Sequence, residues 1–564
     1  MNRFLKGFLA LSLLITSTGL MFAACSSGGC GNKGASKGSS VSGCGECGIV
    51  NSSSCKDNNV CRETCNDRCD CDGYYFGKSH FSPRSQGLDG ARRLSGVVGT
   101  HLVDKEEVYY NFDAALAYQR TFDGDKIGKY FSPNCSNCFR MGDDADLNTD
   151  VRNSDFGYNG TAKVCICPLV QNFIADFNLF VGFNEWLEGL YAEVQVPVVY
   201  TRWDTQCCAN PTRIGFEEDQ NVWENENLFS VKGDDTVVYN NAKAALTGNT
   251  PWGDVPEMCY AKLCCDKQTR VRIADLRFRL GYDFMLKDSY HIGLKAIVAA
   301  PTGNKARAYY AFEPIAGNGG HWELGLGLNA RASLWEKDED KTVNWFFDAE
   351  LTHLFNAKQK RTYDLKPNGV WSRYLLLKEF TKNGENLNVE HPIERGPNVL
   401  TQDTKVRVDI QADYTSFFRI NYNNLLVDLG YNGWVRSTEK LDYCINIPAK
   451  TYGIKGLLDL ADEADQTASK STISKAADAD TRDADEKNNA IQIQYINDDG
   501  SDIDVCSATH PFALSHSVFA HVGYMWSDID WEPTIGFGGK AEFSGRANTA
   551  FNQWELWLKG NVSF

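Results

Sequence analysis

An alternation of apolar and polar residues with a period of two constrains the fold of this chain more than any other feature. In residues 551–564 almost every second residue is apolar, and most of the residues between them are polar. The apolar series is Trp554, Leu556, Leu558, Val562 and Phe564, with Gly560 among them. Because successive side chains of a strand point to opposite faces, this pattern predicts a β-strand with one apolar face that ends on an aromatic residue.

The same alternation recurs along the chain and predicts twelve strands. The stretches are residues 110–119, 173–183, 190–200, 274–284, 290–298, 322–334, 343–351, 406–414, 425–436, 518–526, 535–543 and 554–564. Most of them have the ~9–11 residues that a tilted strand needs to cross a bilayer. Pro197 removes one ladder hydrogen bond and should weaken its strand locally. Further strands at 306–314 and 371–380 would raise the count to 14 or 16.

The connections between these strands alternate between long and short. The long ones are residues 123–171, 204–269, 301–321, 356–404 and 437–512, and the short ones are turns of a few residues. Long loops at one end and short turns at the other are typical of an up-and-down antiparallel β-barrel in an outer membrane. We therefore predict an all-β fold, a transmembrane β-barrel over residues 105–564.

The two faces of the strands indicate which side meets lipid. The polar faces carry charges of both signs, whereas the apolar faces end in aromatic residues such as Trp203, Trp322, Trp335 and Trp526. Aromatic residues at strand ends match the girdles at a membrane interface. The apolar faces should then point outward and the charges into the lumen. A secreted soluble barrel or sandwich is the alternative.

The N-terminus has the features of an export signal. Arg3 and Lys6 precede an apolar run, which a small-residue site at Ala23 and Ala24 follows. We predict a signal peptide over residues 1–24, and Cys25 is an uncertain candidate for lipidation because Phe22 departs from the usual lipobox. No later apolar run is long enough for a spanning helix. Residues 25–104 are expected to form a cysteine-rich periplasmic segment and linker, at the same end of the barrel as the C-terminus. Within it, residues 87–96, with Arg92 and Arg93, could form a short helix inside the periplasmic mouth or an ordinary linker.

Together, the signal peptide, the amphipathic strands, the alternating loops and the terminal Phe564 resemble Gram-negative outer-membrane β-barrel proteins of the porin kind. The resemblance is architectural and covers residues 105–564. It implies an outer-membrane location, contact with outer-membrane lipid, and a last strand whose Phe564 is the signal read by the barrel-assembly machinery. The cysteine content is also similar to that of the disulfide-linked major outer-membrane proteins of chlamydiae, by analogy only.

The chain has 20 cysteines, and none falls inside a predicted barrel strand. In an exported protein they predict disulfides. Cys444 and Cys506 bracket one long loop near its base, so we expect them to pair. An odd cysteine among the other loops would allow an intermolecular disulfide or a homo-oligomer. Zinc bound by CxxC pairs such as Cys135 and Cys138 is the alternative.

Charged residues on the polar faces are the candidate functional residues. The predicted pore-lining set is Glu193, Asp275, Arg277, Arg279, Asp283, Asp348, Glu350, Arg407, Asp409, Asp413, Asp428, Arg436, Lys540, Glu542 and Glu555. Such a wall would screen solutes by charge, although the same charges could instead pair off in a filled lumen, because twelve strands lie between filled and open barrels.

We therefore predict a porin-like channel for passive diffusion of small hydrophilic solutes, with no cofactor and no chemical step. A disulfide-braced structural or adhesive surface protein is the first alternative. A hydrolase at the barrel rim that uses His353 or His516 is the second, although no catalytic motif supports it. The net charge of −16 argues against nucleic acid as a partner.

Overall fold

The computed structural model describes most of the chain after residue 74. The described residues are 60–63, 75–103, 105–142, 151–158, 160–214, 239–252, 255–263, 267–338, 340–379, 393–444, 446–449, 451–454, 496–527, 529, 531–545 and 549–564. The predicted signal peptide (1–24) and Cys25 lie outside these residues. Among the described residues, no helix combines the length and the apolar composition needed to cross a membrane.

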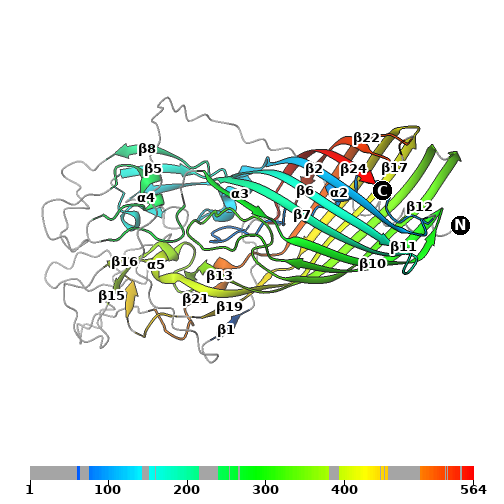
Figure 1. Cartoon of the computed structure of the whole chain (residues 1–564). Coiled ribbons are helices and arrows are strands. Elements are labelled where there is room, and N and C mark those ends of the chain that lie inside the picture. Colours follow the sequence, from blue (N-terminus) through cyan, green and yellow to red (C-terminus); the bar gives the residue numbers. More distant parts are fainter. Residues whose placement is uncertain are drawn as a thin grey trace, which may run out of the picture. The chain divides into compact units, whose positions relative to one another are not determined.

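Twelve antiparallel strands close into a barrel (Figure 1). In chain order they are β2 (Val108–Thr121), β6 (Leu169–Phe183), β7 (Leu190–Asp204), β10 (Leu276–Lys287), β11 (Tyr290–Ala300), β12 (Glu323–Asp338), β13 (Lys341–Thr362), β17 (Thr401–Tyr422), β18 (Leu425–Arg436), β22 (Ala513–Met525), β23 (Thr534–Phe543) and β24 (Gln553–Ser563). Each strand pairs with the next, and β24 pairs with β2 from Asn111↔Ser563 to Thr121↔Gln553. The predicted fold class and the count of twelve strands are confirmed.

The two faces of the barrel wall differ as the alternation predicts. Leu116, Leu326 and Phe537 on the outer face are 63%, 69% and 57% exposed, whereas polar and charged side chains of the same strands are buried inside. An exposed apolar surface of this extent costs free energy in water, and contact with lipid tails removes that cost. The chain therefore has the outer face of a membrane barrel.

The aromatic residues at the strand ends only partly match the predicted girdle. Trp322, Trp335 and Trp526 lie on the outer surface, 55%, 51% and 37% exposed. The assignment of Trp203 to the girdle is wrong, because its side chain is 1% exposed and belongs to the apolar core under the long loops.

Short turns and the C-terminus share one end of the barrel. Phe564 follows β24 there; its backbone N–H donates to Tyr110 O over 2.9 Å, and its ring stacks on that of Tyr110 with centroids 5.6 Å apart. The ring of Phe564 is 63% exposed. The opposite end carries the long connections, in the predicted order.

Three shorter strands extend the wall at the long-loop end. They are β9 (Gln268–Ile273), which pairs with β7; β19 (Glu439–Cys444), which pairs with β17; and β1 (Val60–Glu63), which pairs with β19. Strands β9 and β10 are successive parts of one strand alongside β7, and the break between them lies opposite Pro197. There the Ala274 N–H donates to Pro197 O over 2.8 Å, and Asp275 has a φ of 61°. The proline thus interrupts its neighbour rather than its own strand.

The long loops fold into a cap over their end of the barrel. Its strands are β3 (Cys138–Gly142), β4 (Val151–Arg152), β5 (Gly160–Cys165), β8 (Cys208–Ile214), β14 (Asp364–Leu365), β15 (Leu376–Glu379), β16 (Ile393–Arg395), β20 (Tyr452–Ile454) and β21 (Ile503–Asp504). Its helices are α3 (Gly124–Phe131), α4 (Ala242–Thr247), α5 (Gly396–Leu400) and α6 (Val505–Ala508), with 3-10 turns η2 (Ser154–Phe156) and η4 (Ser372–Tyr374).

One apolar core joins these loops. Phe131, Trp371 and Ile503, from three different long loops, belong to it and are each at most 1% exposed. The segments suggested as extra barrel strands lie in this region: residues 371–380 contribute η4 and β15, and residues 306–314 form an irregular loop. The cap is therefore a packed structure with its own core.

Cysteines brace the cap. Cys138 and Cys165 form a disulfide between β3 and β5, with a sequence separation of 27 residues. Cys135 is also disulfide-bonded, which favours disulfides over zinc for Cys135 and Cys138. Cys506 is in a disulfide as well. Its pairing with Cys444 stays a prediction, because the side chain of Cys444 lies outside the described part of the chain.

Candidate functional site in the barrel lumen

Residues 82–101, called here the luminal segment, run through the interior of the barrel from the long-loop end to the short-turn end. At the long-loop end the chain is fixed in the cap just before the segment: Ser79 N–H donates to Ser507 O over 2.8 Å, and the Phe81 ring stacks on Phe551 at 4.5 Å. At the other end, Val98 N–H donates to Asn561 Oδ1 over 3.2 Å. Residues 25–104 were predicted to lie at the same end of the barrel as the C-terminus, and the position of residues 75–101 in the cap and the lumen corrects this. The short helix considered for residues 87–96 inside the barrel mouth is present as Gly90–Leu94.

Residues 82–101 lie in the lumen because of their charge rather than their hydrophobicity. The segment has no apolar period, but it carries Arg84, Arg92 and Arg93. Among the predicted lumen residues that prove to be buried, nine are carboxylic acids and only four are cations. Buried charges are stable only when paired. The three arginines of the segment offset part of this excess of five carboxylates, to which Asp89 of the segment adds one.

A short helix, α2 (Gly90–Leu94), holds two of these arginines in the middle of the lumen. Asp89 caps it by accepting from Arg92 N–H over 3.2 Å, and the same carboxylate pairs with Lys540 of β23. Gly90 is required by a close approach, because a Cβ there would lie 2.0 Å from Thr415 Oγ1. The helix is thus seated by its cap and its glycine against β23 and β17.

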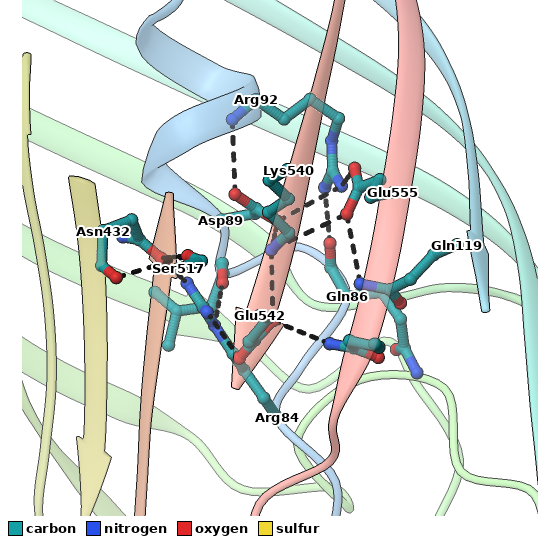
Figure 2. Close-up of polar contacts among 12 residues, drawn as sticks. Arg84, Gln86, Asp89, Arg92, Gln119, Asn432, Ser517, Lys540, Glu542 and Glu555 are labelled. Carbon is teal, nitrogen blue, oxygen red and sulfur yellow. Dashed lines mark hydrogen bonds and ion pairs between the residues drawn. The ribbon is translucent and has the colours of Figure 1, made fainter. Parts of the chain in front are cut away.

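Arg92 is fully buried and is held by two strands. Its Nε lies 3.0 Å from Asp176 Oδ2 of β6, and its Nη1 pairs with Glu555 of β24. The third guanidinium nitrogen donates to Gln86 O within the segment. Figure 2 shows Arg92 and Glu555 facing each other between the helix and the wall.

Arg93 points to the other side of the lumen. Its Nη2 lies 2.6 Å from Asp348 Oδ1 and 3.2 Å from Glu350 Oε1, both on β13. Its Nη1 lies 3.4 Å from Glu193 Oε1 of β7. Adjacent arginines therefore tie α2 to four strands, β6 and β24 through Arg92 and β7 and β13 through Arg93.

Arg84 makes a third set of contacts nearer the cap. Its Nη1 lies 3.2 Å from Glu542 Oε1, and its Nη2 pairs with Asp413 and donates to Asn432 Oδ1 over 2.9 Å (Figure 2). The three arginines and Asp89 together connect the segment to strands on all sides of the lumen.

Most of the sequence-predicted set meets this segment. The residues that lie inside the barrel and are at most 7% exposed are Glu193, Asp275, Arg277, Arg279, Asp283, Asp348, Glu350, Asp413, Asp428, Arg436, Lys540, Glu542 and Glu555. All but Arg277 and Arg279 form a hydrogen bond or an ion pair with residues 82–101. Those two pair within the wall: Arg277 Nη2 lies 2.7 Å from Glu323 and Arg279 Nε lies 2.6 Å from Glu350.

The predicted lumen positions of Arg407 and Asp409 are wrong. Their side chains are 34% and 40% exposed, and they form ion pairs on the outer surface with Asp442 and Lys440. The register of β13 against β17 shifts between Thr352 and Ala357. A shift of one residue inverts which face each side chain occupies. As a result, Val406 and Val408 turn inward beneath the cap.

Sequence reasoning also missed several inward charges. They are Asp113, Asp176, Lys295, Glu323, Arg419 and Lys559, each at most 5% exposed. Lys559 Nζ lies 3.0 Å from Asp113 Oδ1 and donates to Arg92 O and Arg93 O at 2.9 and 2.6 Å, so it holds the carbonyl end of α2. Five of the six sit on the polar side of a predicted strand alternation, which was the available signal, whereas Arg419 lies beyond the strand predicted at 406–414, which extends to Tyr422 in the structure.

Of the histidines considered for a rim hydrolase, both are partly buried on the outer face. His353 Nδ1 contacts Asp409 O at 2.9 Å, and His516 Nδ1 contacts the Tyr431 hydroxyl. Among the described residues, neither histidine forms a hydrogen bond with a serine, threonine or cysteine side chain. Within the lumen, His101, Asp283 and His291 are close enough to share a metal ion, because one ligand atom from each lies within 4.8 Å of the others.

Little free volume remains in the described lumen. A cavity of about 70 Å³ lies beside α2 on the short-turn side, lined by residues that include Arg93, His101, Glu193, His291 and Lys295. A cavity of that size has room for only a few water molecules. The luminal segment and the wall side chains that pair with it therefore occupy much of the described lumen.

The comparisons with known proteins give structural matches only. No known family model and no curated protein matches the chain. An outer membrane channel from Pseudomonas putida F1 matches with 10% identity, 83% of this chain, 99% of that chain and a TM-score of 0.33. A Pseudomonas aeruginosa FadL homologue matches with 12% identity, 86% and 99% coverage and a TM-score of 0.28. Pseudomonas putida OprB matches with 10% identity, 86% and 100% coverage and a TM-score of 0.17.

These scores are low, so the closed strand order and the apolar outer face carry the assignment. The chain is a β-barrel of the outer-membrane type.

Proposed function

We propose that this chain is an outer-membrane channel for small hydrophilic solutes, and that the luminal segment closes it. The observation that carries the proposal is the way the lumen is filled. A separate stretch of chain, rather than side chains of the wall alone, occupies it, and charged contacts hold that stretch in place.

Charged contacts allow the segment to shift aside within the lumen while both of its ends stay held. An apolar core that opened to water would lose burial free energy of about 25 cal/mol for each Å² exposed. By contrast, when a segment bearing Arg84, Arg92 and Arg93 leaves a charged wall, water solvates both partners, which offsets most of the lost ion pairing. The wall left behind would be polar, as passive diffusion of hydrophilic solutes requires.

The outer membrane is the location that fits. Residues 1–24 have the pattern of an export signal, and the barrel has an apolar outer face with exposed Trp322 and Trp335 near its ends. Lipid on the outside and the barrel-assembly machinery, through Phe564, are the partners that follow from this location.

A triple substitution tests the proposal. Arg84→Gln, Arg92→Gln and Arg93→Gln together remove the cations of the segment without changing the strands. In planar bilayers the triple variant should conduct far more often than the unchanged protein, and liposomes that contain it should swell with small sugars. A variant with Arg120→Gln, which alters an exposed arginine on the outer face of β2, is the matched control.

A disulfide-braced structural surface protein is the second candidate, and the packed cap favours it. The long loops share one apolar core and a Cys138–Cys165 disulfide, as expected of a rigid surface. If the triple variant inserts as a heat-modifiable barrel and still never conducts, the channel proposal fails and this candidate stands.

A further inference from the structure

Two histidines and an aspartate meet where the luminal segment leaves the barrel at the short-turn end. His101 ends the segment, Asp283 lies on β10 and His291 begins β11. His101 Nδ1 is 2.6 Å from Asp283 Oδ2, and the imidazole rings of His101 and His291 stack with centroids 4.4 Å apart and an interplanar angle of 20°. One ligand atom from each residue lies within 4.8 Å of the other two.

The three side chains are a ligand set for a divalent transition metal. Imidazole and carboxylate bind Zn²⁺ with bonds of about 2.0–2.2 Å, so neighbouring ligand atoms in a tetrahedral site lie roughly 3.4 Å apart. The present stacking keeps the imidazole lone pairs of His101 and His291 in nearly parallel planes, because the rings are inclined by only 20°. Binding therefore requires one ring to rotate so that both nitrogens face the same point beside Asp283.

The surroundings provide both support and room for that rotation. Asn329 Nδ2 donates to Asp283 Oδ1 over 2.9 Å, and the Tyr191 hydroxyl donates to Asn329 Oδ1 over 3.0 Å. Such outer contacts orient a ligating carboxylate. The cavity of about 70 Å³ is lined by both histidines, Tyr191 and Asn329, so it can take a turning ring and a water molecule as a fourth ligand.

The backbone supplies an independent observation. His101 has a φ of 56°, in the left-handed region that residues other than glycine rarely adopt. Asp283 and His291 are each only 4% exposed, although such polar groups usually remain in water. The chain thus accepts backbone strain and buries polar groups where these three side chains converge.

We propose that His101, Asp283 and His291 bind one divalent transition metal ion, for which Zn²⁺ is the test ion. Because His101 belongs to the luminal segment and the other two ligands belong to the wall, the ion ties the segment to β10 and β11. The inference that this metal-mediated link stabilises a closed channel rests on the proposed function. The inference that the three side chains bind a metal does not.

Zinc binding to the full chain tests the site. Protein purified in detergent with its disulfides intact is stripped with a chelator and titrated with Zn²⁺ against a chromophoric competitor. The unchanged protein should bind one Zn²⁺ per chain, and His291→Ala and Asp283→Asn should each weaken binding at least tenfold. His521→Ala is the matched control: His521 is also buried in the lumen, where its Nδ1 accepts from Trp557 Nε1 over 3.2 Å, and this variant should bind zinc as the unchanged protein does.

A spectroscopic measurement distinguishes this site from zinc held by cysteines. The X-ray absorption spectrum should show nitrogen and oxygen ligands with imidazole scattering and no sulfur. Zinc bound equally well by the unchanged protein and by His291→Ala, or bound through sulfur, or not bound at all, would overturn the site and leave His101 and Asp283 as a hydrogen-bonded pair only.

Hydrogen exchange tests the tie. Zn²⁺ should slow amide exchange in residues 96–102 of the unchanged protein and leave it unaltered in His291→Ala. If zinc binds at the site without slowing exchange there, the tie is refuted. A null conductance result for the channel proposal would affect neither measurement.

Discussion

Replacing Arg92 with methionine should release the luminal segment without unfolding the barrel. Arg92 is completely buried and faces two carboxylates, Asp176 and Glu555, that are 5% and 0% exposed. Methionine keeps much of the side-chain volume but leaves both carboxylates without this cation. Loss of one partner from a buried ion pair costs about 3–5 kcal/mol.

The lower end of that range applies here. Lys540 Nζ already lies 3.7 Å from Glu555 and can move toward it, and water can enter from the neighbouring cavity. About 3 kcal/mol corresponds to roughly a 100- to 200-fold shift in the equilibrium between seated and released segment. Local opening of this kind exposes backbone amides to exchange while the strands stay paired.

Hydrogen exchange read by mass spectrometry measures the shift. Amides of residues 89–96 should exchange about 100-fold faster in Arg92→Met than in the unchanged protein, because they include the α2 bonds and the Gly96 N–H that donates to Asp428 Oδ2 over 2.8 Å. Amides of β22 and β23 should exchange at unchanged rates. Adding Glu555→Gln removes one unpaired carboxylate and should recover about a factor of ten, whereas Arg120→Met should change nothing.

Two outcomes would refute this reasoning. Equal exchange of residues 89–96 in both proteins would mean that the Arg92 ion pairs do not hold the segment. Faster exchange throughout the barrel strands would mean that Arg92 supports the whole fold rather than the position of the segment.

Two further predictions concern the membrane and assembly. Leu326→Arg on the outer face of β12, where the leucine is 69% exposed, should lower the free energy of unfolding in bilayers by about 2–4 kcal/mol. The control variant Asn356→Arg, on the exposed surface toward the cap, should lower it by far less. Equal losses for the two variants in a urea titration would argue against a lipid-facing belt. Phe564→Ala removes the ring that stacks on Tyr110. This variant should reduce the amount of the heat-modifiable, inserted form in cells and leave the conductance of inserted molecules unchanged. Normal surface levels of the variant would show that the terminal aromatic is not the assembly signal.

The barrel could be predicted from the sequence because its signal is local and repeated. Leu324, Leu326 and Leu328 alternate on β12 as a strand with one lipid-facing side must, and the long and short connections fix which ends meet. Prediction failed where β13 and β17 change register. Near Asp409 the polar face of β17 turns outward. The alternation within β17 alone cannot reveal this shift, because the shift depends on the pairing with β13.

The luminal segment was harder to predict because its contacts are long-range. Arg92 reaches Glu555 across 463 positions of sequence, and nothing in the local composition of residues 87–96 distinguishes a luminal helix from an ordinary linker. The excess of carboxylates on the polar faces was the available sign, since a barrel lined with unbalanced acid needs cations from elsewhere. Which stretch supplies them depends on the closed shape of the wall.

The path of the luminal segment also sets an order of events for folding. The barrel wall is a closed ring of strands, and the luminal segment passes through it. The ring closes where its first strand, β2, pairs with its last, β24. A thread that continues on both sides cannot be added after such a ring has closed without being pulled through lengthwise. The sheet must therefore curl around residues 82–101 while its seam is still open. After closure the segment can shift within the lumen but remains held at both ends, by β2 on one side and by Ser79 and Phe81 in the cap on the other.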